Sequence, residues 1–179
     1  ETSSAFDMPM IDALEKKGSL TKDITVICNG FKTFQYKQYI IDMLHDGFKN
    51  IIPVLDNKEE FNIYDDELDI PCSIGMRIAA EEQPDSQFYT SRLGIRMEDI
   101  IEFYNHKIAP NPNFKVKLLH FFINSGISDT PYYWNELEKY TILYCKFKKI
   151  NPDLDTLDIG GGMPFKDSLA FDFDYEYMV

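Results

Sequence analysis

The sequence is short of positive charge. Among 179 residues, 18 are Lys or Arg and 30 are Asp or Glu, so the net charge is −12 and the pI is about 4.6. Because such a surface repels phosphates, it disfavours nucleic acid as a partner. No apolar run approaches the roughly 18 residues of a membrane-spanning helix. We therefore expect a protein that binds neither nucleic acid nor membranes.

Cysteine and histidine are also scarce. Cys28, Cys72 and Cys145 are odd in number and far apart in apolar runs, which predicts reduced core residues rather than a disulfide framework. Reduced thiols are typical of a cytoplasmic protein. The three histidines show no spacing typical of a metal site, and His120, within an apolar run, is expected to be a hydrogen-bonded core residue. We expect no metal.

What the sequence does have is a regular alternation of short apolar runs with helical patterns. An alternation of this kind favours a parallel sheet with crossover helices. The runs are apolar along their whole length, as expected for strands covered on both faces. The predicted strands are 24–28, 50–55, 73–80, 114–123 and 156–159, and the predicted helices are 8–17, 35–45, 97–106 and 130–149, with a short helix or turn at 58–64.

Two architectures fit this pattern: an open doubly wound sheet, or part of an eight-stranded (β/α) barrel of the TIM type. A whole barrel needs about 250 residues, so the chain has room for about five to six of the eight strands. It opens on Glu1 rather than Met and stops within the aromatic, acidic stretch 171–179. We expect residues 1–179 to be one domain that is a fragment of a larger barrel.

The most informative motif is the glycine run Gly160–Gly162, directly after the last predicted strand. Without a Cβ, glycines let backbone N–H groups approach an anion closely. The carboxyl ends of parallel strands form the ligand face of such folds, and phosphate is a frequent ligand there. The motif is neither Gly-x-Gly-x-x-Gly nor a P-loop, which disfavours dinucleotide and nucleoside triphosphate sites. The alternative is an ordinary flexible turn.

Two further features are expected on the same face. The predicted strand 114–123 is followed by Asn124 and Ser125, which either contact a ligand or form an ordinary turn. Arg77 lies inside an apolar strand, where a cation is costly unless it meets an anion. Its partner is expected to be an interior carboxylate or a phosphate.

Taken in order, four motifs resemble the pyridoxal-phosphate-dependent decarboxylases of basic amino acids, which have an alanine-racemase-like barrel. The motifs are Arg77–Ala79, Ser91–Gly94, Asn124–Gly126 and Leu157–Pro164. Within the family the resemblance is greatest to a divergent bacterial branch of biosynthetic arginine decarboxylases, through residues 1–7, 27–32, 119–124 and 168–171. The resemblance covers nearly the whole chain.

The resemblance implies a pyridoxal 5′-phosphate site. Gly160, Gly161 and Gly162 would donate backbone N–H groups to its phosphate, Ser125 would add a side-chain contact, and Arg77 would lie near the ring substituents. Phe122 stands where the family usually stacks a histidine on the pyridine ring. Asn124 replaces a usual glycine.

The resemblance also implies what lies outside this chain. The Schiff-base lysine is expected upstream, and the carboxylate that pairs with the pyridine nitrogen is expected downstream. The C-terminal β domain that completes the site across a homodimer is expected downstream as well. We thus expect the parent to be a carboxy-lyase that converts arginine to agmatine in polyamine biosynthesis, while the fragment alone is inactive. The alternatives are a decarboxylase of ornithine, lysine or diaminopimelate, a catalytically inactive regulatory or phosphate-binding barrel, and an open-sheet phosphate-binding enzyme of another family.

Overall fold

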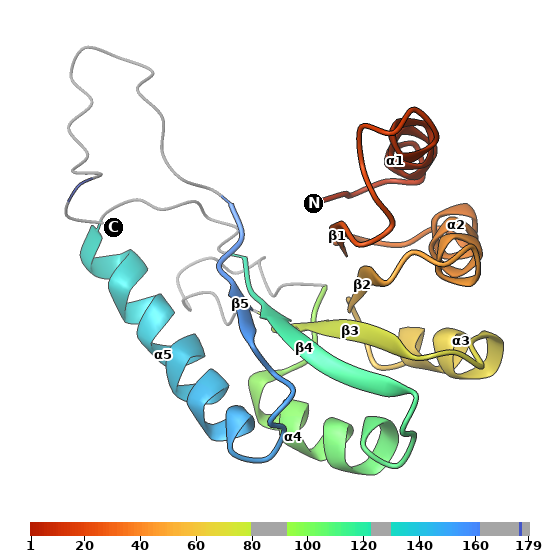
Figure 1. Cartoon of the computed structure of the whole chain (residues 1–179). Helices are drawn as coiled ribbons and strands as arrows, with labels where there is room; N and C mark the ends of the chain where they lie inside the picture. The colour runs from red at the N-terminus through yellow and green to blue at the C-terminus, as the bar shows by residue number, and fades with distance from the viewer. Residues whose placement is uncertain (80–92, 123–129, 162–175, 177–179) are drawn as a thin grey trace.

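Five parallel strands form one sheet that curls into a half-barrel, with the helices along its outer side (Figure 1). The computed structural model describes residues 1–79, 93–122, 130–161 and 176. The sheet order is β1-β2-β3-β4-β5, and every neighbouring pair is parallel. The strands are β1 (Thr25–Cys28), β2 (Asn50–Leu55), β3 (Cys72–Arg77), β4 (Phe114–His120) and β5 (Thr156–Asp158).

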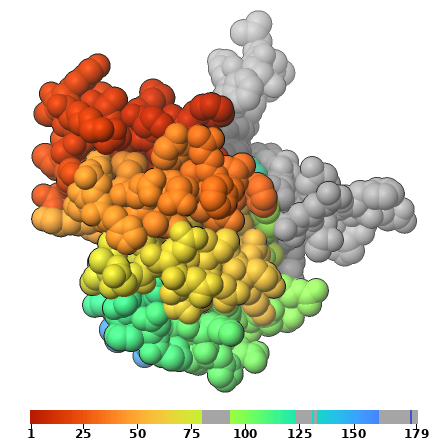
Figure 2. Space-filling view, turned by 90° about the vertical axis from the view of Figure 1, so that its right-hand side faces the viewer, coloured from red at the N-terminus to blue at the C-terminus, as the bar shows by residue number. Residues whose placement is uncertain are grey.

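One helix precedes the first strand, and the others connect consecutive strands, as parallel pairing requires. They are α1 (Asp7–Lys16), α2 (Phe34–His45), α3 (Glu60–Glu67), α4 (Ile100–Phe103) and α5 (Thr130–Lys148). A 3₁₀ turn, η1 (Met97–Asp99), leads into α4, and a π-helical turn, η2 (Tyr104–Ile108), follows it. Figure 2 shows the outer, helix-covered side, where the successive β/α units stack in chain order.

The main hydrophobic core lies between the outer face of the sheet and these helices. Aromatic side chains fill much of it: Phe121, directly after β4, stacks on Tyr140 of α5 with ring centroids 3.9 Å apart. Phe61 of α3 meets Phe114 of β4 edge to face at 5.0 Å. Burying such rings is the largest favourable contribution to folding here, and it holds each helix to its strand.

A second, smaller apolar cluster covers the inner, concave face. Ile52, Val54 and Leu118 form it, with Ile27 packed against them. Gly75 belongs to this layer, because a Cβ there would lie 2.9 Å from Leu118 Cδ2 and 3.0 Å from Val54 Cγ2. Small and large residues thus alternate around the interior, as the packing of a barrel requires.

The parallel half-barrel predicted from the sequence is confirmed, and most element positions are close to their predicted bounds. Two predicted strands are too long: β3 ends at Arg77 rather than at 80, and β4 ends at His120 rather than at 123. Beyond Arg77 the chain leaves the ladder, and Ile78 forms only an isolated bridge to Ile95. The apolar composition that predicted longer strands continues into residues 78–79 and 121–122, which lie outside the strands.

The cysteine prediction is correct for two of three positions. Cys28 and Cys72 are buried, and burial raises the pKa of the Cys72 thiol to about 12, so it stays protonated. Cys145 is exposed instead, because it faces outward from α5. Only one face of α5 packs against the sheet, and the apolar pattern of the helix does not show whether Cys145 lies on that face or on the exposed one.

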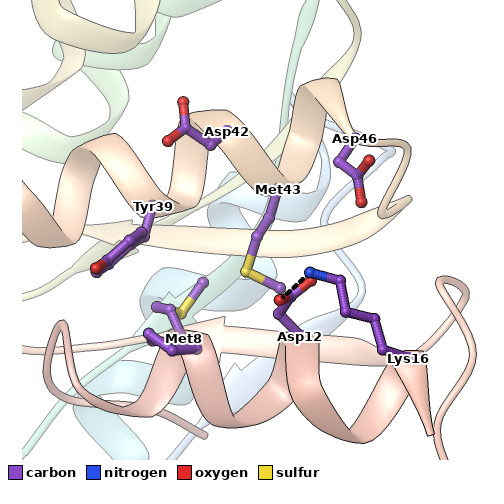
Figure 3. Close-up of a pocket in the computed structure, with 8 residues that line it drawn as sticks. Met8, Asp12, Lys16, Tyr39, Asp42, Met43 and Asp46 are labelled. Carbon is purple, nitrogen blue, oxygen red and sulfur yellow. Dashed lines mark hydrogen bonds and ion pairs between the residues drawn. The ribbon is translucent and has the colours of Figure 1, made fainter.

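A groove between α1 and α2 encloses about 370 Å³ (Figure 3). Met8 and Met43 point toward one another across it, and an ion pair joins Lys16 to Asp12 at 2.7 Å. The groove lies among the outer helices, away from the carboxyl ends of the strands where ligands bind in this architecture.

Candidate functional site

A polar layer lies at the carboxyl ends of the strands, directly above the inner apolar layer. Since side chains alternate between faces, the residue two positions beyond an inward-facing one also points inward. In all five strands that residue is polar or charged, although the inner layer below is apolar or small. The five are Asn29, Asp56, Arg77, His120 and Asp158, two positions after Ile27, Val54, Gly75, Leu118 and Thr156 respectively.

Arg77 contacts one other residue of this polar layer, called the rim below, and one aromatic ring beside it. Its Nη1 lies 3.5 Å from Asp56 Oδ1, and its guanidinium lies over the Phe122 ring, with Cζ 6.0 Å from the centroid. The predicted anionic partner of Arg77 is thus an interior carboxylate. The second oxygen, Asp56 Oδ2, is buried and has no hydrogen-bond partner among the described residues. A buried carboxylate oxygen left in this state favours a ligand that can donate a hydrogen bond.

The backbone of Asp56 is fixed from two sides. Its N–H donates to Glu60 Oε2 at 3.0 Å, and its carbonyl accepts the N–H of Gly94 at 2.6 Å. Gly94 has φ +105°, and a Cβ there would lie 2.6 Å from the backbone nitrogen of Ala79. Only glycine tolerates this conformation and this closeness, so Gly94 packs directly against the backbone of Ala79 and Asp56.

Lys32 is a buried cation that pairs with Glu60, the residue that binds the Asp56 N–H. Its side chain is fully buried, and Nζ lies 3.2 Å from Glu60 Oε1. The ammonium also donates to the carbonyls of Gly30 and Val54, so its three N–H groups all have acceptors. A lysine held in this way serves as a structural cation, because no lone pair is free to attack a substrate.

Tyr64 supports the carboxylate that holds Lys32. Burial, followed by the charge of Glu60, raises the pKa of Tyr64 well above its ordinary value, so the hydroxyl remains protonated. It lies 3.2 Å from Glu60 Oε1 and donates to it. The buried charge of Glu60 is therefore balanced by a cation and by hydrogen bonds.

The other half of the rim is organised around Asp158, the last residue of β5. Its Oδ2 lies 3.1 Å from His120 Nδ1 and accepts a hydrogen bond from Asn29 Nδ2 at 3.2 Å. Its Oδ1 accepts the N–H of Gly160 at 2.9 Å. Burial pushes the pKa of Asp158 upward, but His120, the Gly160 amide and Asn29 outweigh it, and the pKa is lowered overall. The carboxylate is therefore ionised at neutral pH.

The glycine turn packs tightly against the end of β4. Gly160 has φ +67°, and a Cβ there would lie 2.5 Å from the carbonyl oxygen of Phe121 and 3.3 Å from Phe122 Cδ2. A Cβ at Gly161 would meet nothing within 4 Å. The two glycines thus differ: the first is required by the turn itself, and the second leaves open space beside the backbone.

Four of the seven predicted site residues lie in the described part of the chain, and they are contiguous. Gly160 contacts Phe122, Phe122 lies beneath Arg77, and Gly161 follows Gly160 on the same rim. The remaining three, Gly162, Asn124 and Ser125, lie outside the described residues. Which of the seven touch a cofactor stays a prediction.

Asn29, Lys32, Asp56 and Asp158 were not among the predicted site residues. The sequence does carry a pattern that could have found Asn29, Asp56 and Asp158. Each is a polar residue at the end of an apolar run, two positions after a residue that faces inward. Lys32 carries no such signal, since it lies four residues beyond β1 and reaches the rim only through the fold. Within the described ranges no three His, Cys, Asp or Glu side chains form a possible metal site, and no helix is long and apolar enough to cross a bilayer.

Solved structures with a similar fold include two amino acid decarboxylases. Lysine decarboxylase from Selenomonas ruminantium has a TM-score of 0.70 at 19% identity, covering 99% of this chain and 43% of that one. Diaminopimelate decarboxylase from Helicobacter pylori, complexed with L-lysine, has a TM-score of 0.73 at 16% identity, covering 99% of this chain and 45% of that one. At such identities the likeness shows the fold alone.

Curated relatives are biosynthetic arginine decarboxylases. That of Prochlorococcus marinus (strain MIT 9215) is 28% identical over 169 residues, which is 90% of this chain and 24% of the relative. That of Citrifermentans bemidjiense is 25% identical over 152 residues, which is 81% of this chain and 24% of the relative. The chain thus spans about a quarter of the length of the curated relatives it matches.

Residues 13–174 match the family described as pyridoxal-dependent decarboxylase, pyridoxal binding domain. The match takes in β1 to β5, the polar rim and the glycine turn. The family resemblance inferred from four short motifs is therefore confirmed, and the chain belongs to the pyridoxal-binding domain family of the pyridoxal-dependent decarboxylases.

Proposed function

We propose that this chain is the larger part of the cofactor-binding barrel of a longer decarboxylase that converts arginine to agmatine. The observation that carries the proposal is the match to biosynthetic arginine decarboxylases over 81–90% of the chain. An exposed apolar stripe on α1, Phe6, Met10 and Leu14, supports the view that the half-barrel is covered by further segments of a longer protein. We propose a cytoplasmic homodimer acting in polyamine biosynthesis.

The rim fits a phosphorylated pyridine cofactor. The turn at Gly160 leaves no room for a side chain, and Gly161 leaves the backbone open to an anion. Phe122 offers a ring face next to the Arg77 guanidinium, an environment suited to a flat, electron-poor ring. When bound, pyridoxal 5′-phosphate supplies the ring that accepts the electron pair left as the α-carboxylate departs as carbon dioxide.

In this proposal the residues of the chain bind and orient rather than transfer protons. Gly161 and Gly162 donate backbone N–H groups to the phosphate, and Ser125 adds its hydroxyl. Phe122 supports one face of the ring, and Arg77, held by Asp56, faces its substituents. Asn124 lies beside them. The lysine and the carboxylate that complete the chemistry are contributed by segments outside this sequence, so we expect the isolated chain to be inactive.

Arginine is proposed over other diamino acids because of the curated relatives. The test is agmatine and carbon dioxide formation by the full-length protein with pyridoxal 5′-phosphate, with lysine, ornithine and diaminopimelate as parallel substrates. We expect turnover of arginine to exceed that of each alternative. Preferential turnover of lysine or diaminopimelate would move the protein to the specificity of its structural neighbours.

A second candidate is a catalytically inactive, phosphate-binding barrel. Phe122 favours it, because phenylalanine can stack on a ring but cannot hydrogen-bond or titrate like the histidine usual at this position. The full-length sequence separates the two, since a decarboxylase needs the upstream lysine and the downstream carboxylate. Absence of carbon dioxide release from all four amino acids would favour the inactive barrel.

A further inference from the structure

A side-chain bridge crosses the mouth of the half-barrel. Asn29 follows β1 and Asp158 ends β5, and these are the two edge strands of the sheet. Their side chains nevertheless meet, with Asn29 Nδ2 3.2 Å from Asp158 Oδ2, although 129 positions separate them in the chain. The curl of the sheet therefore brings its two edges into contact through polar side chains at the ligand rim.

The Asp158 carboxylate uses both oxygens within this bridge. Oδ2 meets Asn29 and His120, and Oδ1 accepts the backbone N–H of Gly160. The Gly160 amide is thus engaged by the carboxylate. This contact spans two residues and closes a tight turn, which sets the direction in which Gly161 leaves the strand.

From this geometry we propose that Asp158 is a positioning residue for the phosphate-binding turn, held in place by a hydrogen bond from Asn29 and lying 3.1 Å from His120 Nδ1. The inference rests on the proposed function, because it assumes that the turn binds a phosphate. A carboxylate suits this role, since a hydrogen bond from an amide to an ionised acceptor is stronger than one to a neutral acceptor. The carboxylate itself touches no phosphate; it acts through the backbone of Gly160.

The substitution Asp158→Asn tests the role with little change of shape. The new side chain keeps an oxygen for the Gly160 amide. Its NH₂ group can donate to Asn29 Oδ1, which is buried without a partner among the described residues. The variant is therefore expected to fold, while the charge that holds the turn is lost.

Dissociation constants for three probes are measured on the full-length apoprotein: pyridoxal 5′-phosphate, pyridoxal without phosphate, and inorganic phosphate. In Asp158→Asn we expect the constants for pyridoxal 5′-phosphate and inorganic phosphate to rise about tenfold, as losing one charge-assisted hydrogen bond predicts. The constant for pyridoxal should change less than about twofold, because it has no phosphate to lose.

Asp155→Asn is the matched control. It removes a carboxylate three residues earlier, where Asp155 faces Lys117 at 3.5 Å on an exposed surface, and should leave all three constants unchanged. An unchanged affinity for pyridoxal 5′-phosphate in Asp158→Asn would overturn the proposal, and so would an equal loss of pyridoxal binding, which would indicate a general structural role.

The probes also separate this inference from the proposed function. If the wild-type protein decarboxylates no amino acid, yet Asp158→Asn weakens inorganic phosphate about tenfold, the enzyme proposal fails and the positioning role stands. If the wild-type protein is an active decarboxylase and Asp158→Asn leaves its affinities for phosphate and pyridoxal 5′-phosphate unchanged, the positioning role fails and the enzyme proposal stands.

Discussion

The two ends of the sheet carry the same types of ion pair in opposite environments. At the carboxyl end, Lys32–Glu60 and Arg77–Asp56 are almost entirely buried. At the amino end, Lys115–Asp153 and Lys117–Asp155 lie on the surface, with side chains 39–55% exposed. Water screens the second group, and so only the first is expected to matter to structure and function.

This difference indicates that the functional site of such a fold lies at the end of the sheet where the charges are buried. Burying charge is costly and persists only where geometry and hydrogen bonds compensate for it. In the rim, a tyrosine hydroxyl, two backbone carbonyls and a glycine amide hydrogen-bond to the buried charged groups. At the amino end, the two ion pairs are exposed instead. The comparison can be tested by substitutions at both ends.

The largest effect is expected from Lys32→Met. The substitution leaves the Glu60 carboxyl group buried with its cation gone, which costs about 3–5 kcal/mol of folding free energy. Urea unfolding of the full-length protein, followed by circular dichroism, measures it. Lys115→Met at the amino end is the control, with an expected cost below about 1 kcal/mol. Equal losses in the two variants would contradict the contrast between the ends.

A smaller effect is expected from Gly160→Ala. The new Cβ would lie 2.5 Å from the Phe121 carbonyl oxygen in a residue with φ +67°. The turn must shift, at a cost of about 1–3 kcal/mol. Gly161→Ala, with open space at its Cβ, should cost less than about 1 kcal/mol. Thermal melting of both variants checks the difference, and a Gly161→Ala protein that is the less stable of the two would refute this account of the turn.

A third effect concerns acid. The pKa of Asp158 is lowered in the folded protein, so its contribution to stability is fully present above its unfolded pKa and is lost as pH falls through the folded pKa. Asp158→Asn should therefore lower stability at neutral pH by about 1–2 kcal/mol. The gap to the wild type should close below about pH 4, once the carboxyl is protonated. Chemical denaturation at a series of pH values measures the gap; one that stays constant into acid would argue against an ionised Asp158.

The smallest effect is expected at the pair Lys117–Asp155. A double-mutant cycle with Lys117→Met and Asp155→Asn should give a coupling below about 1 kcal/mol, because the pair is exposed. The coupling should shrink further in 1 M salt, where charges are screened beyond about 3 Å. A coupling that is large and independent of salt would show that the amino end resembles the rim after all.

Sequence alone determined the order and type of nearly every element. Strands such as Asn50–Leu55 lie where a β-branched apolar run predicts them, since both faces of a parallel strand are buried and its composition shows it. The same reasoning found Arg77 and the glycine turn, because a cation in an apolar run and three successive glycines each need a special environment. Four motifs in the right order were enough to indicate the family.

Only the tertiary structure decided how these residues meet. A shift in pairing register between Ile74 and Gly75 leaves Lys117 without a pairing residue on β3 and turns Leu118 and His120 inward, and periodicity along one strand does not reveal such a shift. The contact of Asn29 with Asp158 depends on how strongly the sheet curls, a property of the whole sheet. The local sequence determines which secondary structure a residue adopts and whether it prefers a buried or an exposed face. Packing of the whole fold determines which residues far apart in the chain come into contact.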